Sequence, residues 1–111
     1  EFAILNTRDS KTGYESLIPP GFNVENATPA RIFLTMALYR PTNVAGRVKC
    51  PALVIAGEND SLIPIEAVKK AAAKMKQAEF MSLPLDHFDP YLGEPFNKVS
   101  QKQLGFLKTH L

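Results

Sequence analysis

Hydrophobic positions are arranged differently in the two halves of the chain. Residues 1–28 carry short apolar clusters between turn formers, which predicts a surface-wrapping segment without a core of its own. Thr28 and Pro29 then supply a helix cap and a first helical proline. Apolar residues lie all round the following positions, so we expect a helix over 29–40 that is covered on more than one face. Pro41 ends it, because proline opposes helix continuation.

The second half has the pattern of an α/β unit. Residues 52–56 form a continuous apolar run that turn residues close, which predicts a strand buried on both faces, as in parallel sheets. Apolar positions then recur at helical spacing over 64–77. The rest of the pattern predicts a strand over 79–83, a loop over 85–93 and a final helix over 95–110. The expected order is helix, strand, helix, strand, loop, helix.

Two chemically useful residues follow the two predicted strands. A strand, a helix and a second strand form a crossover unit with parallel strands, whose carboxyl ends lie at one sheet edge. Asp60 follows the first strand and His87 the second. Neighbouring strands lie about 4.8 Å apart, so the carboxylate and the imidazole are expected within hydrogen-bond reach, about 2.6–3.2 Å. A carboxylate there fixes the imidazole tautomer and stabilises the imidazolium that forms when histidine acts as a base.

The same residues also have plainer interpretations. The local spacing of Asp60 fits a turn residue whose side chain bonds nearby backbone amides. Asp86, His87 and Asp89 are metal-ligand types, but the set is short, and we assign no metal site. His110 fits a helix end. Cys50 fits a small buried residue at the entrance to a strand.

Composition narrows the class of protein. The chain has 111 residues, enough for at most one ordinary domain, and 45% of them are hydrophobic, which excludes disorder by composition. Lys and Arg number 13 and Asp and Glu 11, without the basic excess of a nucleic-acid binder. One cysteine cannot form an intrachain disulfide. No apolar run approaches the roughly 18–20 residues of a membrane span and no signal pattern opens the chain, so we expect a cytoplasmic protein without a membrane partner.

The run over 50–60, followed by Ile63-Pro64 and later by His87-Phe88, resembles the C-terminal part of the α/β-hydrolase fold. In that fold the catalytic acid follows the seventh strand and the histidine follows the eighth. Residues 20–22 and 29–31 are more weakly similar to the cap or linker of bacterial hydrolases related to serine esterases and aminopeptidases. The resemblance implies a cap or linker remnant over 1–46 and a C-terminal hydrolase segment over 47–111.

The resemblance also implies roles for single residues. Asp60 is the expected triad acid and His87 the expected general base, in a hydrolase that acts on ester or amide bonds without a metal or an organic cofactor. Phe88 and Tyr91, beside the histidine, are candidates for lining a substrate pocket, although an apolar packing role fits them equally.

The nucleophile of such an enzyme does not occur in this chain. None of its serines stands in the Gly-x-Ser-x-Gly setting, and in this fold the nucleophile precedes the acid. We therefore expect a C-terminal fragment, inactive alone, whose partner is the missing N-terminal part or a second copy of the chain. Asp86 also departs from the family, which has glycine before the histidine. Two alternatives stay open: a fragment of a dehalogenase or epoxide hydrolase with an aspartate nucleophile, and a non-catalytic binding or assembly module.

Overall fold

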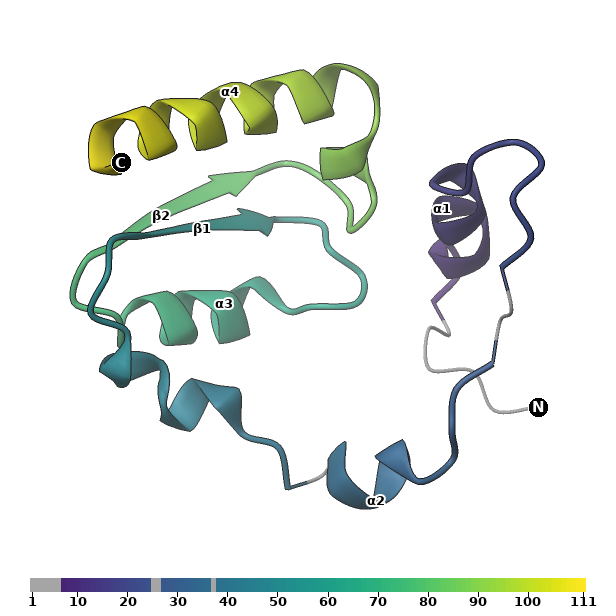
Figure 1. The fold of residues 1–111 in the computed structure, drawn as a ribbon, viewed down its shortest axis with the longest axis horizontal. Coiled ribbons are helices and arrows are strands. Elements are labelled where there is room, and N and C mark those ends of the chain that lie inside the picture. Colours follow the sequence, from purple (N-terminus) through teal and green to yellow (C-terminus); the bar gives the residue numbers. More distant parts are fainter. Residues whose placement is uncertain (1–6, 25–26, 37) are drawn as a thin grey trace.

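The computed structural model describes residues 7–24, 27–36 and 38–111. Positions 1–6, 25, 26 and 37, which belong to the predicted surface segment and the predicted 29–40 helix, lie outside the described residues. The helices and strands follow one another along the chain as drawn in Figure 1. They are α1 (Ser10–Ser16), α2 (Ile32–Met36), β1 (Ala52–Gly57), α3 (Ile65–Ala72), β2 (Ala78–Leu83) and α4 (Gly93–His110), with short 3-10 turns at Pro41–Asn43, Ala45–Arg47 and Asp89–Tyr91.

Two parallel strands form the sheet of the described residues. β1 and β2 pair in register from Ala52 opposite Ala78 to Gly57 opposite Leu83. Helix α3 lies on one side of this sheet and α4 on the other (Figure 1). The predicted α/β class and the two parallel strands are confirmed, and both strand ends point to the same edge of the sheet.

The strand β1 is less buried than predicted. Ala56 is its one buried residue, and the other five are only partly covered. The expectation of burial on both faces is wrong because β1 pairs along one edge alone among the described residues, so the other edge stays uncovered. Within the described ranges the buried apolar residues are few, and all but one aromatic residue are small: Ala45, Ala56, Ala72, Phe88 and Val99.

Helix α3 is shorter than its apolar pattern predicts. The helix ends at Ala72, although the periodicity runs on to Met75. After it the backbone tightens, and the amides of Lys74 and Met75 bond carbonyls three residues back. β2 begins at Ala78, so the chain must turn within five residues after α3, and this connection cuts the helix short.

The predicted 29–40 helix is reduced to the single turn of α2. Its amides bond mainly carbonyls three residues back, and the Thr35 hydroxyl donates to the Ile32 carbonyl at 3.2 Å. Leu34 is 79% exposed, so the expected cover on more than one face is not found in the part of the chain that the structure describes. A helix that buries no face lacks the tertiary packing that normally stabilises such short segments.

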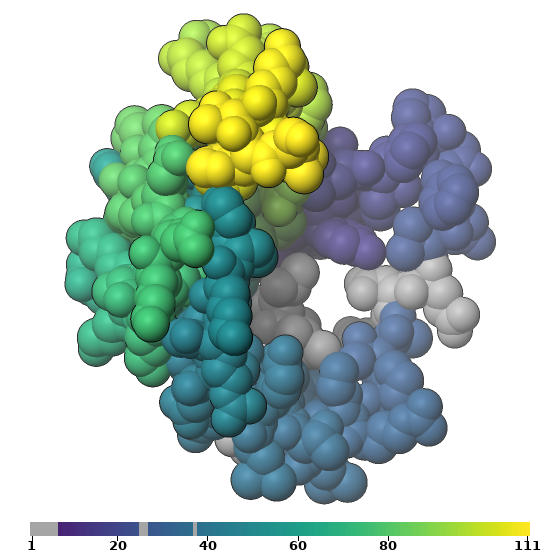
Figure 2. All heavy atoms as spheres, turned by 60° about the vertical axis from the view of Figure 1, so that its left-hand side comes forward, coloured from purple at the N-terminus to yellow at the C-terminus, as the bar shows by residue number. Residues whose placement is uncertain are grey.

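Two further expectations for the N-terminal half are corrected. Residues 10–16 form helix α1, which the turn-rich composition had concealed, and Ser10 within it is buried. Cys50 is exposed rather than buried, because no element of the described residues covers the entrance to β1. In Figure 2 the N-terminal segments, coloured purple to blue, lie to one side of the α/β unit. No helix among the described residues is long and apolar enough to cross a membrane.

Candidate functional site

The loops after the two strands are joined by backbone hydrogen bonds. The Glu58 amide donates to the Leu83 carbonyl at 2.8 Å, and the Asn59 amide donates to the Leu85 carbonyl at 3.2 Å. Gly57 lies where these loops approach most closely, since a Cβ added to it would stand 2.5 Å from the Leu85 carbonyl oxygen. The strand ends thus bring the loops that carry Asp60 and His87 side by side.

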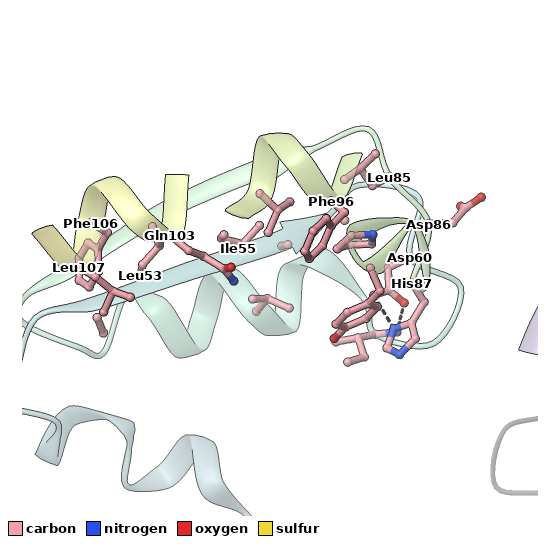
Figure 3. Close-up of a pocket in the computed structure, with 18 of the residues that line it drawn as sticks. Leu53, Ile55, Asp60, Leu85, Asp86, His87, Phe96, Gln103, Phe106 and Leu107 are labelled. Carbon is pink, nitrogen blue, oxygen red and sulfur yellow. Dashed lines mark hydrogen bonds and ion pairs between the residues drawn. The ribbon is translucent and has the colours of Figure 1, made fainter. Parts of the chain in front are cut away.

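Asp60 uses its two carboxylate oxygens for different partners. Oδ1 accepts hydrogen bonds from the backbone amides of Leu62 and Ile63, both at 2.8 Å. Oδ2 lies 2.9 Å from Nδ1 of His87 (Figure 3). The predicted contact between the two side chains is therefore present, and so is the turn contact that the plainer interpretation expected. The turn fixes the carboxylate, which then holds the ring.

Asp60 is ionised at neutral pH. Burial of its side chain, which is 12% exposed, would raise the pKa of this carboxyl group. The hydrogen bonds from His87 and from the amides of Ile63 and Leu62 oppose burial and hold the pKa of Asp60 below its ordinary value of 3.8. A charged carboxylate only accepts hydrogen bonds, so the imidazole carries its proton on Nδ1 when neutral. Nε2 is then the nitrogen that can accept a proton.

The two aspartates that flank His87 have other partners. Asp89 Oδ2 accepts the Asp86 amide at 2.8 Å and so closes the turn around the histidine. Asp86 is exposed, and among residues 7–24, 27–36 and 38–111 the His87 ring bonds no side chain other than Asp60. Neither Asp86 nor Asp89 thus replaces Asp60 as the partner of the imidazole. In the same ranges no group of three or more His, Cys, Asp or Glu side chains could hold a metal ion.

The two candidate pocket residues take different positions. Phe88 is buried, meets the His87 ring edge-on at 4.9 Å between centroids, and does not line the cavity beside the histidine. Tyr91 is exposed and does line it. Of the two residues Tyr91 lies at this cavity and Phe88 does not, and a substrate-pocket role stays a prediction. Phe88 packs because its side chain points towards α1 and meets Gly13.

A cavity of about 870 Å³ begins at His87 and runs along β1. Figure 3 places Asp60 and His87 at one end of it and Phe106 and Leu107 of α4 at the other. Ile55 of β1 lines the stretch between them. The cavity thus joins a polar end that carries the acid and the base to an apolar groove between β1 and α4.

Sequence patterns missed one residue pair at the site. The Ser61 hydroxyl lies 2.9 Å from Oδ1 and 3.0 Å from Oδ2 of Asp9, 52 residues away in the sequence. The capping type of Asp9 and Ser10 could have located α1, but no local pattern links Asp9 to Ser61. No serine of the described residues bonds His87: Ser10, Ser16, Ser61 and Ser82 have other hydrogen-bond partners, and Ser100 has none with His87.

Comparison with known proteins gives three partial relatives. The chain is 32% identical over 106 residues to the quorum-quenching protein AidA of Acinetobacter baumannii, covering 96% of this chain and 35% of that protein. It is 26% identical over 111 residues to two Escherichia coli proteins, each described as an uncharacterized 31.7 kDa protein in the traX-finO intergenic region, of which it covers 39%. No family model and no solved structure matches. The chain thus spans between a third and two fifths of these curated relatives.

Proposed function

We propose that this chain supplies the acid and the general base of an α/β-hydrolase that cleaves ester or amide bonds through an acyl-enzyme. The observation that carries the proposal is the 2.9 Å hydrogen bond between Asp60 and His87 at the shared carboxyl end of two parallel strands. Catalytic groups of open α/β sheets gather at that edge. The order of acid and histidine along the chain is the one that the α/β-hydrolase fold requires.

The chemistry follows from the protonation of the pair. His87 Nε2 takes the proton of a nucleophilic hydroxyl while its oxygen attacks the substrate carbonyl carbon, and the negative charge of Asp60 stabilises the resulting imidazolium. The imidazolium then gives that proton to the leaving alcohol or amine, which leaves an acyl-enzyme. Water, deprotonated by the same nitrogen, cleaves the acyl bond and regenerates the nucleophile.

The nucleophile in this proposal comes from the rest of a longer protein. The chain spans only 35% of the A. baumannii relative, so such a protein has room for it. The β1 edge offers a place to attach the rest of the sheet. Ala52 and Glu58 donate their amides to the β2 side. By the alternation of a parallel ladder, Leu53 and Ile55 present theirs to the unpaired edge, where a further strand can add. We refer to the product of the whole gene as the complete protein.

The name of one relative indicates a substrate class. AidA of A. baumannii is called a quorum-quenching protein. We therefore propose a small signalling molecule with an ester, lactone or amide bond as the substrate. The apolar groove that leaves His87 along β1 supports a substrate with a hydrocarbon part, because apolar surface binds apolar groups.

The test is hydrolysis of p-nitrophenyl butyrate by the complete protein and its variants. We expect Asp60→Asn and His87→Ala to lower kcat by about 10⁴-fold, since the first disturbs the tautomer and the second removes the base. His110→Ala is the matched control, because His110 lies on α4 and faces Glu79 at 3.7 Å, away from the site. Wild-type kcat in both site variants would contradict the proposed roles.

The sequence of the remainder decides between hydrolase chemistries. A Gly-x-Ser-x-Gly turn there would support acyl transfer. An aspartate in place of the serine would instead indicate alkyl halides or epoxides as substrates. A folded complete protein that turns over none of these substrates would favour the non-catalytic module instead.

A further inference from the structure

Helix α1 is attached to both loops of the site at the residues next to the acid and the base. Ser61, which follows Asp60, bonds Asp9 at the start of α1. Phe88, which follows His87, packs against Gly13 in the middle of α1. One short helix therefore contacts both loops, in each case at the residue directly after the acid or the base.

The Asp9 contact replaces an ordinary helix cap. Aspartate at this position normally accepts backbone amides of the first helical turn. Here the side chain makes no such bond, and both carboxylate oxygens instead face the Ser61 hydroxyl at 2.9 and 3.0 Å. The hydrogen bonds from Thr7 and Ser61 lower the pKa of Asp9, with a smaller contribution from His87. The turn that begins at Asp60 is thus held by two sets of hydrogen bonds. One joins Ser61 to the Asp9 carboxylate, and the other joins the Leu62 and Ile63 amides to the Asp60 carboxylate.

The Gly13 contact is steric. Any Cβ at Gly13 would overlap the Phe88 ring, so glycine is required for α1 to lie this close. The Phe88 ring in turn meets the His87 imidazole edge-on, with an interplanar angle of 83°. A shift of α1 would therefore move the Phe88 ring, and the Phe88 ring would in turn displace the imidazole.

We propose that α1 is a positioning element that holds Asp60 and His87 at bonding distance, with Asp9 acting through Ser61 and Gly13 acting through Phe88. Neither Asp9 nor Gly13 touches the reacting atoms. The inference rests on the proposed function for its kinetic consequence, because a misplacement of about 1 Å in a catalytic group can cost about 10²-fold in rate. The geometric part concerns only the Asp60–His87 bond and can be measured without turnover.

The first experiment removes the polar contact from either side in the complete protein. Asp9→Ala and Ser61→Ala should each lower kcat for p-nitrophenyl butyrate by about 10- to 100-fold with KM nearly unchanged. The double variant should lose less kcat than the two single losses combined, since both single variants remove the Asp9–Ser61 contact. Asp9→Asn keeps an oxygen that accepts the Ser61 hydroxyl and should restore most of the lost kcat. The His87 Nδ1 proton in the NMR spectrum should move in both alanine variants and return in Asp9→Asn.

The second experiment tests the steric contact. Gly13→Ala should move the same His87 proton signal and lower kcat, and adding Phe88→Leu should reverse part of both changes by making room for the methyl group. Gly105→Ala is the matched control, because a Cβ there meets nothing within 4 Å.

The outcomes separate this inference from the proposed function. If the complete protein hydrolyses no ester, the proposed function fails, while the His87 signal still tests the positioning. If Asp9→Ala and Ser61→Ala lower stability but leave both the His87 signal and kcat at wild-type values, α1 has a structural role only and the inference is overturned. Ser61→Ala leaves the sequence of α1 unchanged, so it tests the polar contact even if Asp9→Ala or Gly13→Ala misfolds the helix.

Discussion

The α/β unit from β1 to α4 and the region around α2 both contain apolar runs but are stabilised differently. In the unit, two strands pair in register and helices cover both sides of the sheet, so Ala56 and Val99 are buried. In α2, Ile32, Phe33 and Leu34 are all exposed and the backbone bonds are local. Apolar residues stabilise a fold only where another element covers them. The comparison indicates that the α2 region needs a cover that residues 7–24, 27–36 and 38–111 do not provide.

Helix α1 falls between these two cases. It has no apolar face in a core, yet it is attached by the Asp9–Ser61 hydrogen bonds and by the close fit of Gly13 to Phe88. A few specific long-range contacts therefore place it. Such a helix has little local stability of its own and depends on the loops that it contacts.

The largest difference in unfolding free energy is expected between truncation of the buried Phe88 side chain and truncation of an exposed side chain of α2. Phe88→Ala in the complete protein should cost about 3–5 kcal/mol of unfolding free energy, as for other buried phenylalanines. Leu34→Ala is the comparison, measured by urea unfolding. Leu34→Ala should change the unfolding free energy by less than about 0.5 kcal/mol if the residue remains exposed. A cost of about 2 kcal/mol or more at Leu34 would mean that the rest of the complete protein buries α2.

A smaller effect is expected at the end of β1. Gly57→Ala places a methyl group against the Leu85 carbonyl oxygen and should destabilise the protein by about 1–3 kcal/mol through overpacking. Gly105→Ala, in an open part of α4, should be neutral or stabilising by up to about 1 kcal/mol, because it lowers the entropy of the unfolded chain. Urea midpoints of the two variants, measured together, check the difference. Equal midpoints would mean that the two strand-end loops can move apart.

Acid should remove the contribution of the Asp60–His87 pair to stability. The pKa of Asp60 is lower in the folded chain than its ordinary value of 3.8, so its stabilising effect is complete above that value and is lost as the pH falls through the folded pKa. The stability difference between the wild type and Asp60→Asn should therefore shrink on acidification past 3.8. Urea unfolding across that range measures it. Asp86→Asn is the control because Asp86 is exposed. A difference that stays constant with pH would contradict a hydrogen-bonded carboxylate.

The smallest effect is expected at the boundary between the regions. Cys50 is exposed, so Cys50→Ser should change stability by less than about 0.5 kcal/mol. The thiol should also react with a thiol reagent in the native complete protein. Protection of that thiol would show that another segment covers the entrance to β1.

Much of the α/β unit could be predicted because its signals are local. The apolar run at 52–56 and the periodic helix after it are each read within a short window, and together they imply parallel strands. From that implication the meeting of Asp60 and His87 followed, and the atoms lie 2.9 Å apart. Their catalytic roles, the proposed hydrolase family and the 1–46 and 47–111 division remain proposals.

Local sequence also determined the order of helices and strands within the α/β unit, and which two polar side chains follow its strands, because both depend on residue spacing. Tertiary structure decided how far each element extends and what it buries. Among the described residues, α2 spans only Ile32–Met36 and β1 is only partly buried, because few other elements pack against them. It also decided the partners of Asp9 and Phe88, since a contact across 52 residues leaves no periodic trace in the sequence. Such contacts form only when separate loops meet in space.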